Sequence, residues 1–286
     1  MYHELPNFWK DLLLQGLAED GWPWDWTTLG IQKTNSRKVQ AKLLAKSNGV
    51  WAAQPLSEAL ISLAKTLNIR EVLRDGQPFK SGDSLLQIEG ELEEILALER
   101  PYLNLAAYVS GIATATQRIV HQVGKIRSQI PPRVTLTRKT LPGYRDLAIH
   151  GVRTGGGFPH RTSLSSGVLI KENHIRSAGS ITLAVQQARA VAPHLLKIEV
   201  EVTNLDEFQE ALAIQADGIL LDNFRAPEIP IALQRLPRSG PRPFIEISGG
   251  LNETTIADYV LEGVDILSVG ALTHSVSSCD FSLLIQ

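Results

Sequence analysis

From about residue 115 onwards, short apolar runs alternate with longer amphipathic segments. Strands are expected at residues 134–137, 168–170, 197–202, 218–221, 244–247 and 265–269, with a weaker candidate at 151–153. The intervening segments ITLAVQQARAVAP, LDEFQEALAIQA and ETTIADYVLEGV have helical spacing, and Asn204 and Asn252 precede two of them as N-caps. Repeated strand–helix units predict a parallel sheet, and about seven of them predict an incomplete α/β barrel.

Residues 1–114 follow a different pattern. VQAKLLAKSNGVWAAQ alternates as paired strands do, LSEALISLAKTLN is helical, and a hairpin-like stretch from Phe79 leads into a long helix. The tail CDFSLLIQ has the pattern of a strand that returns to this first region. We therefore expect an N-terminal α+β open-sandwich domain of residues 1–114 and 275–286, and an α/β barrel domain of residues 115–274 that carries the active site.

Composition narrows the functional class. The 286 residues are 43% hydrophobic and carry a net charge of −2, so neither a nucleic-acid nor a membrane partner is expected. The single cysteine, Cys279, excludes an intrachain disulfide and fits a reducing cytoplasm. The N-terminal segment is interrupted by Lys10, Asp11 and Glu19, unlike a signal peptide, and no run approaches the roughly 20 apolar residues of a membrane span. A soluble, cytoplasmic protein is expected.

Polar and glycine residues follow the predicted barrel strands where each strand ends. The carboxyl ends of barrel strands meet on one rim, which is where such barrels have their active sites. These residues are therefore expected to share one site: Arg138, Lys139, Lys171, Glu201, Asp222, Ser248, Gly249, Gly250, Gly270 and Ala271.

The cationic residues have two interpretations. Arg138 and Lys139 could be surface cations, or could bind carboxylate and phosphate groups by a planar fork and a point charge. The triple glycine at 155–157 lacks the GK[ST] ending of a nucleotide P-loop, but it would let the backbone approach a ligand beside His160 and Arg161. Lys171 could lie at the rim or act as a Schiff-base nucleophile.

The acidic and glycine residues complete the predicted site. Glu201 and Asp222, on successive strands, could bind Mg²⁺, accept sugar hydroxyls or pair with a nearby lysine. Glu199 has the same parity as Glu201 but lies deeper along the strand, so it ranks below Glu201. The glycines after the last two strands suit a phosphate bound through backbone N–H groups. Together these features predict an enzyme for a substrate with several carboxylates and a phosphorylated sugar.

Several motifs carry a family resemblance. TRKTLPG, GGGFPHR, GVLIKENHI, EVEV, LLDNF, EISGGL and DILSVGALTHS resemble, in order and spacing, the quinolinate phosphoribosyltransferase family. AEDGWPWDWTT and the long-helix region extend the resemblance over nearly the whole chain. It implies that quinolinate and phosphoribosyl pyrophosphate react to nicotinate mononucleotide, pyrophosphate and CO₂ in de novo NAD biosynthesis.

The resemblance also implies residue roles. Arg138, Lys139, His160, Arg161 and Lys171 would surround the quinolinate carboxylates and the pyrophosphate. Glu201 and Asp222 would hold the ribose hydroxyls and Mg²⁺, and with Lys139 and Lys171 they form the expected catalytic set. The 5′-phosphate would bind at Ser248, Gly249, Gly250, Gly270 and Ala271. Arg100 would reach in from the neighbouring subunit of a homodimer.

Three alternatives remain open. One is a molybdenum-transport-associated paralogue, which shares the fold and the TRKT and GGG…HR motifs and acts on another anionic substrate. The second is a Schiff-base lyase that uses Lys171. The third is a catalytically silent binding protein.

Overall fold

The computed structural model describes residues 7–31 and 37–286, which divide into two compact units. The first unit comprises Met1–Ala115, Asp146–Gly155 and Val276–Gln286, and the second comprises Thr116–Arg145 and Gly156–Ser275. The division falls inside the 35-residue helix α4 (Leu92–Ile126). Residues 146–155, assigned to the barrel domain by sequence, thus group with the first unit, and the first six residues of the expected N-terminal domain lie outside the described ranges.

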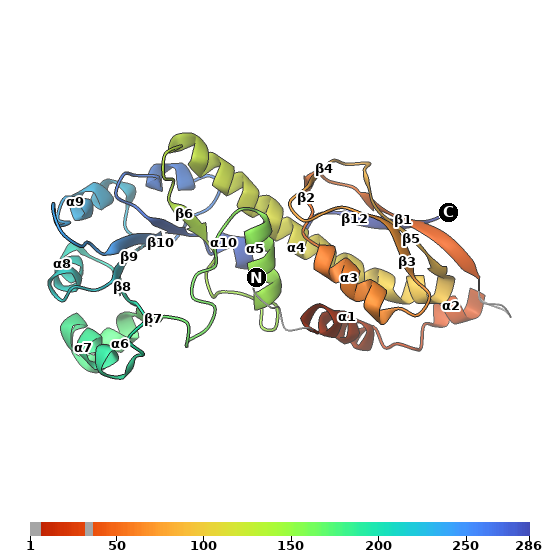
Figure 1. Ribbon diagram of the computed structural model, residues 1–286, viewed down its shortest axis with the longest axis horizontal. Coiled ribbons are helices and arrows are strands. Elements are labelled where there is room, and N and C mark those ends of the chain that lie inside the picture. The colour runs from red at the N-terminus through yellow and green to blue at the C-terminus, as the bar shows by residue number, and fades with distance from the viewer. Residues whose placement is uncertain (1–6, 32–36) are drawn as a thin grey trace. The chain divides into compact units, whose positions relative to one another are not determined.

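The first unit is built on an antiparallel sheet with the strand order β12–β1–β5–β3 (Figure 1). Its strands are β1 (Lys38–Ala45), β3 (Asn68–Val72), β5 (Ser84–Glu91) and β12 (Phe281–Ile285), and the short β2 (Gly49–Val50) pairs with β4 (Pro78–Phe79). Its other helices are α1 (Phe8–Glu19), α2 (Trp26–Ile31), α3 (Gln54–Leu63) and α5 (Arg145–Thr154). Alternate residues of β1 are buried, as the sequence pattern predicts. The predicted return of the C-terminal tail is confirmed, because β12 pairs with β1.

The weak strand predicted at 151–153 is wrong, because these residues belong to helix α5. The buried face of α5 includes Leu147, Ala148, Gly151 and Val152, a helical rather than an alternating pattern. Gly151 lies so close to Ile112 that a Cβ would come within 2.9 Å of its side chain. Gly151 therefore permits close packing of helix α5 against Ile112. In the sequence, this segment is only a short apolar run, which suggested a strand.

The second unit contains a six-stranded parallel sheet with the order β6–β11–β10–β9–β8–β7 (Figure 1). Its strands are β6 (Arg133–Thr135), β7 (Val168–Ile170), β8 (Ile198–Val202), β9 (Gly218–Asp222), β10 (Phe244–Ser248) and β11 (Ile266–Ser268), so the main predicted strands all form. A single parallel bridge between Thr135 and Phe158 is the only further pairing at this sheet within the described ranges. The result is the incomplete α/β barrel predicted from the sequence, with six full strands rather than about seven.

The connections are mostly helical. They are α6 (Glu172–Ala178), α7 (Ile181–Val191), α8 (Leu205–Ala213), α9 (Ile229–Leu233), α10 (Ala271–His274) and the 3₁₀ turns η1 (Ala226–Glu228) and η2 (Ile256–Tyr259). Asn204 caps α8 by accepting hydrogen bonds from the N–H groups of Asp206 and Glu207. The helix expected after Asn252 is wrong in kind: the segment forms only η2, and Asn252 closes a turn with Thr254 and Thr255. In the part of the chain that the structure describes, no helix has the length and apolar character needed to cross a membrane.

The strands of this sheet place polar residues near their carboxyl ends. The burial of β8, β9 and β10 is nearly continuous and relaxes at Glu201, Asp222 and Ser248, near the carboxyl ends. Ser248 is the register partner of both Asp222 and Ser268 on its neighbouring strands. Parallel pairing in this register brings the strand ends together, as an active-site rim requires.

Candidate active site

A cavity of about 460 Å³ lies at the carboxyl ends of the barrel strands, entirely within the second unit. Eight of the residues expected at the site line it: Arg138, Lys139, His160, Arg161, Lys171, Glu201, Asp222 and Ser248. Gly249, Gly250, Gly270 and Ala271 follow the same strand ends but are not among the lining residues. Arg100 is an exposed residue of α4 in the first unit.

The cationic side of the cavity is formed by Arg138, Lys139 and Arg161. The Nε atom of Arg138 is buried without a hydrogen-bond partner among the described residues. Burial and then the charge of Arg138 lower the pKa of Arg161, which shows that the two guanidinium groups influence each other. None of the three residues forms an ion pair with a carboxylate in the described ranges. Neighbouring cations that form no ion pair are able to receive an anion.

The acidic side of the cavity is formed by Glu201 and Asp222. Lys171 Nζ lies 2.5 Å from Glu201 Oε2, and Asn223 Nδ2 donates to Asp222 Oδ2 at 2.8 Å. Each carboxylate thus keeps one oxygen that accepts no hydrogen bond from the residues described. Carboxylate oxygens on neighbouring strands, open to one cavity, are suitable ligands for Mg²⁺ and acceptors for sugar hydroxyls.

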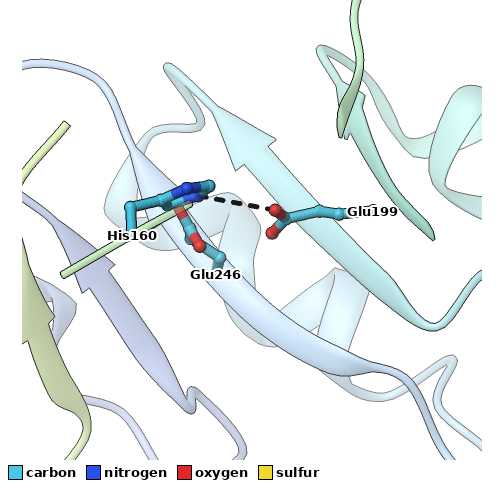
Figure 2. A group of neighbouring side chains, drawn as sticks. All are labelled: His160, Glu199 and Glu246. Carbon is cyan, nitrogen blue, oxygen red and sulfur yellow. Dashed lines mark ion pairs between the residues drawn. The ribbon is translucent and has the colours of Figure 1, made fainter. Parts of the chain in front are cut away.

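A buried cluster of three side chains adjoins these residues: His160, Glu199 and Glu246 (Figure 2). His160 Nε2 lies 3.3 Å from Glu246 Oε1 and 3.5 Å from Glu199 Oε2. Glu246 is 1% exposed and Glu199 is 6% exposed, so both carboxylates depend on partners inside the protein. The three ligand atoms lie within 4.8 Å of one another, a separation that a metal ion could also bridge.

The cluster shares its protons. Burial lowers the pKa of His160, but hydrogen bonds and charges from Glu199 and Glu246 outweigh burial and raise it to about 10. Burial also raises the pKa of Glu199, to about 7. However, His160 Nδ1 accepts a hydrogen bond from the backbone N–H of Arg161 at 2.7 Å, which requires an unprotonated Nδ1. The arrangement that satisfies this bond has a proton on Nε2 of His160 and none on Nδ1.

The phosphate-binding prediction rests on the loop after β10. Gly249 has φ +100° and Gly250 has φ +66°, values that favour glycine over other residues. A Cβ at Gly249 would lie 2.2 Å from Asn223 Oδ1. The short 3₁₀ turn η2 replaces the helix expected there, so the loop N–H groups, and not a helix dipole, are what this segment offers a phosphate.

Sequence reasoning missed Glu246 and ranked Glu199 below Glu201. The signal was present: Glu246 interrupts the apolar run FIEIS at the same parity as Ser248, and Glu199 shares the parity of Glu201. An acidic residue inside a strand that is otherwise buried needs a partner. The partner, His160, comes from a distant segment, so the cluster becomes visible only in the fold.

A larger cavity, of about 590 Å³, lies in the first unit between residues of α1, α3 and α4. One of its carboxylates, Glu94, accepts hydrogen bonds from the backbone N–H groups of Lys65 and Thr66 and from the Thr66 hydroxyl, so this group serves local structure.

Comparisons with known proteins identify a family. The sequence model of the quinolinate phosphoribosyl transferase N-terminal domain matches residues 25–110, and that of the C-terminal domain matches residues 112–284. A probable nicotinate-nucleotide pyrophosphorylase [carboxylating] of Synechocystis sp. is 37% identical over 274 residues, covering 96% of this chain and 91% of its own. The corresponding protein of Methanocaldococcus jannaschii is 42% identical over 221 residues, 76% of each chain.

A solved structure extends the likeness to three dimensions. The nicotinate-nucleotide pyrophosphorylase from Francisella tularensis superposes with a TM-score of 0.88 at 36% identity, covering 99% of this chain and 98% of that one. The two domain matches, the Synechocystis relative and this solved structure each cover their part of the chain, and together they span nearly all of it. The chain therefore belongs to the quinolinate phosphoribosyltransferase family.

Proposed function

We propose that this protein is a pentosyltransferase of de novo NAD biosynthesis. It transfers phosphoribosyl from phosphoribosyl pyrophosphate to quinolinate and decarboxylates the product, giving nicotinate mononucleotide, pyrophosphate and CO₂. The observation that carries the proposal is the unpaired Arg138, Lys139 and Arg161 in the same cavity as Glu201 and Asp222. The names of the relatives support the same reaction.

Binding requires neutralisation of many negative charges. Quinolinate carries two carboxylates on adjacent ring carbons, which suit the planar guanidinium forks of Arg138 and Arg161. Lys139 and Lys171 would contact the pyrophosphate as point charges. A substrate phosphate that attracts Lys171 would also compete with Glu201 for it, which would free that carboxylate for the ribose.

The transfer step needs positioning more than proton transfer. The lone pair of the pyridine nitrogen forms a bond to C1 of the ribose while the C1–oxygen bond breaks, and its electron pair leaves with pyrophosphate. Positive charge develops on the sugar, and Glu201 and Asp222 at the cavity wall stabilise it. Loss of CO₂ then leaves an electron pair at C2, stabilised by the adjacent pyridinium nitrogen, and C2 takes up a proton. The residues mainly hold the two substrates in register.

Mg²⁺ is the proposed cofactor. The free oxygens of Glu201 and Asp222 fit a hard cation that keeps most of its ligands from water and substrate phosphates. When bound, the ion neutralises charge on the leaving pyrophosphate.

Three further parts of the proposal follow the family resemblance. The 5′-phosphate binds at the loops of Ser248, Gly249 and Gly250 and of Gly270 and Ala271, where positive φ at Gly249 and Gly250 presents backbone N–H groups. The enzyme acts as a homodimer in which Arg100 of one subunit serves the site of the other; the exposure of Arg100 is compatible with this role. The reaction takes place in the cytoplasm.

The alternatives fit less well. A Schiff-base nucleophile must be an amine free to attack a carbonyl, whereas Nζ of Lys171 is engaged in an ion pair with Glu201. The molybdenum-transport-associated paralogue has no observation in its favour here, since the relatives described above are all named pyrophosphorylases. A silent binding protein would not need the two carboxylates opposite the cationic residues.

The test is an assay of the purified protein with quinolinate, phosphoribosyl pyrophosphate and Mg²⁺, following nicotinate mononucleotide and CO₂. Product formation that stops with EDTA and returns with Mg²⁺ is the expected result. The Arg161→Ala variant should lose activity, while Arg118→Ala, which removes an exposed partner of Glu253, should keep it. Quinolinate binding without turnover would point to the silent binder, and borohydride trapping of a carbonyl substrate would point to the lyase.

A further inference from the structure

A chain of hydrogen bonds runs through the barrel strands to Arg161. The hydroxyls of Thr135 in β6 and Ser268 in β11 are 2.7 Å apart, and Ser268 Oγ donates to Glu246 Oε1 at 2.5 Å. His160 Nε2 lies 3.3 Å from the same oxygen of Glu246. At the other side of the ring, Nδ1 accepts the backbone N–H of Arg161 at 2.7 Å. The chain thus connects the neighbouring strands β6, β11 and β10 to a cationic residue of the cavity.

Both nitrogens of the His160 ring are occupied inside the protein. Because Nδ1 accepts from Arg161, the neutral ring carries its proton on Nε2, where it meets the carboxylates of Glu246 and Glu199 (Figure 2). The ring therefore lines the cavity without a free nitrogen for a substrate. The ring of His160 can therefore influence anion binding only through Arg161, whose backbone N–H it accepts.

A metal ion in the cluster would contradict these contacts. Coordination by Nε2 needs its lone pair, so the single proton of the neutral ring would move to Nδ1. That proton would then point at the N–H of Arg161, and the 2.7 Å hydrogen bond would be lost. Glu246 Oε1 already accepts from Ser268 as well. A proton on Nε2, and not a cation, is compatible with the hydrogen bonds that Arg161 and Ser268 make to this cluster.

We propose that Glu246 is a positioning residue of the anion site: its carboxylate fixes the ring of His160, and the ring fixes the backbone of Arg161. The Arg161 side chain has a second point of attachment, because its Nη1 donates to the carbonyl oxygen of Gly167 at 3.3 Å. With both ends held, the guanidinium is oriented before a ligand arrives, so less conformational entropy is lost on binding. The identity of the anion as quinolinate rests on the function proposed above.

The direction in which quinolinate affinity changes distinguishes a positioning role of Glu246 from a purely electrostatic one. Glu246 is a buried acid beside an anion site, so its charge alone opposes anion binding. Removal of the charge should then strengthen quinolinate binding, equally in Glu246→Gln and Glu246→Leu. Under the positioning role the two variants differ. Gln keeps an acceptor oxygen for Ser268 and His160, whereas Leu keeps none and releases the ring.

The first experiment measures quinolinate affinity by calorimetry. Glu246→Leu is expected to bind about tenfold more weakly than the wild-type protein, and Glu246→Gln to bind at least as tightly as the wild type. In an Arg161→Ala background the difference between the two variants should vanish, because the residue through which they act is gone. Equal strengthening in both variants, or a difference that persists without Arg161, would overturn the proposal.

The second experiment does not depend on the substrate. Nitrogen-15 NMR of the protein with labelled histidine, recorded in EDTA, should show His160 as the Nε2–H tautomer in the wild type and in Glu246→Gln, with loss of that single form in Glu246→Leu. Disappearance of the signal in His160→Gln assigns it. A Nδ1–H tautomer in the wild type would overturn the positioning role. The expected tautomers without any quinolinate binding would leave it standing and reject the proposed function instead.

Ser268→Ala provides a second test in case the Glu246→Leu variant does not fold. This variant keeps the carboxylate and removes only the hydroxyl that donates to Oε1. It should fold, with a melting temperature close to that of Glu246→Gln, and weaken quinolinate binding severalfold in the same Arg161-dependent manner. Unchanged affinity in a folded Ser268→Ala, together with an unchanged His160 tautomer, would contradict the proposed chain.

Discussion

Lys171 and Glu201 form an ion pair of 2.5 Å that joins the carboxyl ends of the neighbouring strands β7 and β8. The carboxylate is largely shielded from solvent and the ammonium group is half-exposed, at 15% and 46% of side-chain surface. One partner can therefore turn to a ligand while the other stays fixed on its strand. This arrangement suits a pair of charges that neutralise each other until a phosphorylated sugar enters and separates them.

Glu201→Gln tests the role of this carboxylate. The variant removes the countercharge of Lys171 and one stabilising charge for the developing sugar cation, so kcat is expected to fall about 100-fold. Steady-state formation of nicotinate mononucleotide measures it. Glu228→Gln is the matched control, because Glu228 pairs with Arg225 at the surface, where an ion pair contributes little. A Glu201→Gln enzyme with wild-type kcat would remove Glu201 from the mechanism.

Arg138→Lys tests whether the anion site needs a planar fork or only a charge. The substitution keeps the positive charge and loses the paired donors, so KM for quinolinate is expected to rise about tenfold, with a smaller change in KM for phosphoribosyl pyrophosphate. Arg118→Lys, at an exposed pair 3.5 Å from Glu253, should leave both constants unchanged. An unchanged KM in Arg138→Lys would mean that charge alone suffices there.

Glu199 gives the protein a specific dependence of stability on pH. Burial raises its pKa from 4.5 to about 7, so the folded state binds this proton more tightly than the unfolded chain. The resulting stabilisation is complete below pH 4.5 and is lost as the pH rises through 7. Relative to Glu199→Gln, the free energy of unfolding of the wild type is therefore expected to fall by up to about 3 kcal/mol between pH 5 and 8.

Urea denaturation of both proteins across this pH range measures the difference. Glu199→Gln removes only the carboxyl contribution directly. Parallel stability curves for the two proteins would show that Glu199 is already ionised in the folded state at pH 5.

The main strands of the barrel and most of its cavity could be predicted from the sequence because both depend on local pattern. Continuous apolar runs mark the buried strands, and the polar residue that ends each run lies at the carboxyl edge of a parallel sheet. Lys171, Glu201 and Asp222 follow this rule and line the cavity. The capping role of Asn204 is equally local, since its side chain bonds the next turn of the chain.

The missed features depend on contacts between distant segments. The link from Ser268 through Glu246 to His160 joins β11, β10 and the segment that follows the glycine run, so no spacing in the sequence encodes it. The short strand expected at 151–153 failed for a related reason. Gly151 is there for close packing on Ile112, and an apolar run of this length does not distinguish a helix from a strand.

Gly249→Ala tests the loop assigned to the 5′-phosphate. A Cβ at this position would meet Asn223 Oδ1 at 2.2 Å, and φ of +100° is unfavourable for alanine. Because Asn223 also holds Asp222 by a 2.8 Å hydrogen bond, its displacement should disturb the carboxylate as well as the loop. We expect a loss of about 1–3 kcal/mol in the free energy of unfolding and a higher KM for phosphoribosyl pyrophosphate. Gly124→Ala, in helix α4 with no atom within 4 Å of the added Cβ, should instead be neutral or stabilising with unchanged KM. Wild-type stability and KM in Gly249→Ala would show that the loop relaxes around alanine and that the phosphate does not depend on this backbone conformation.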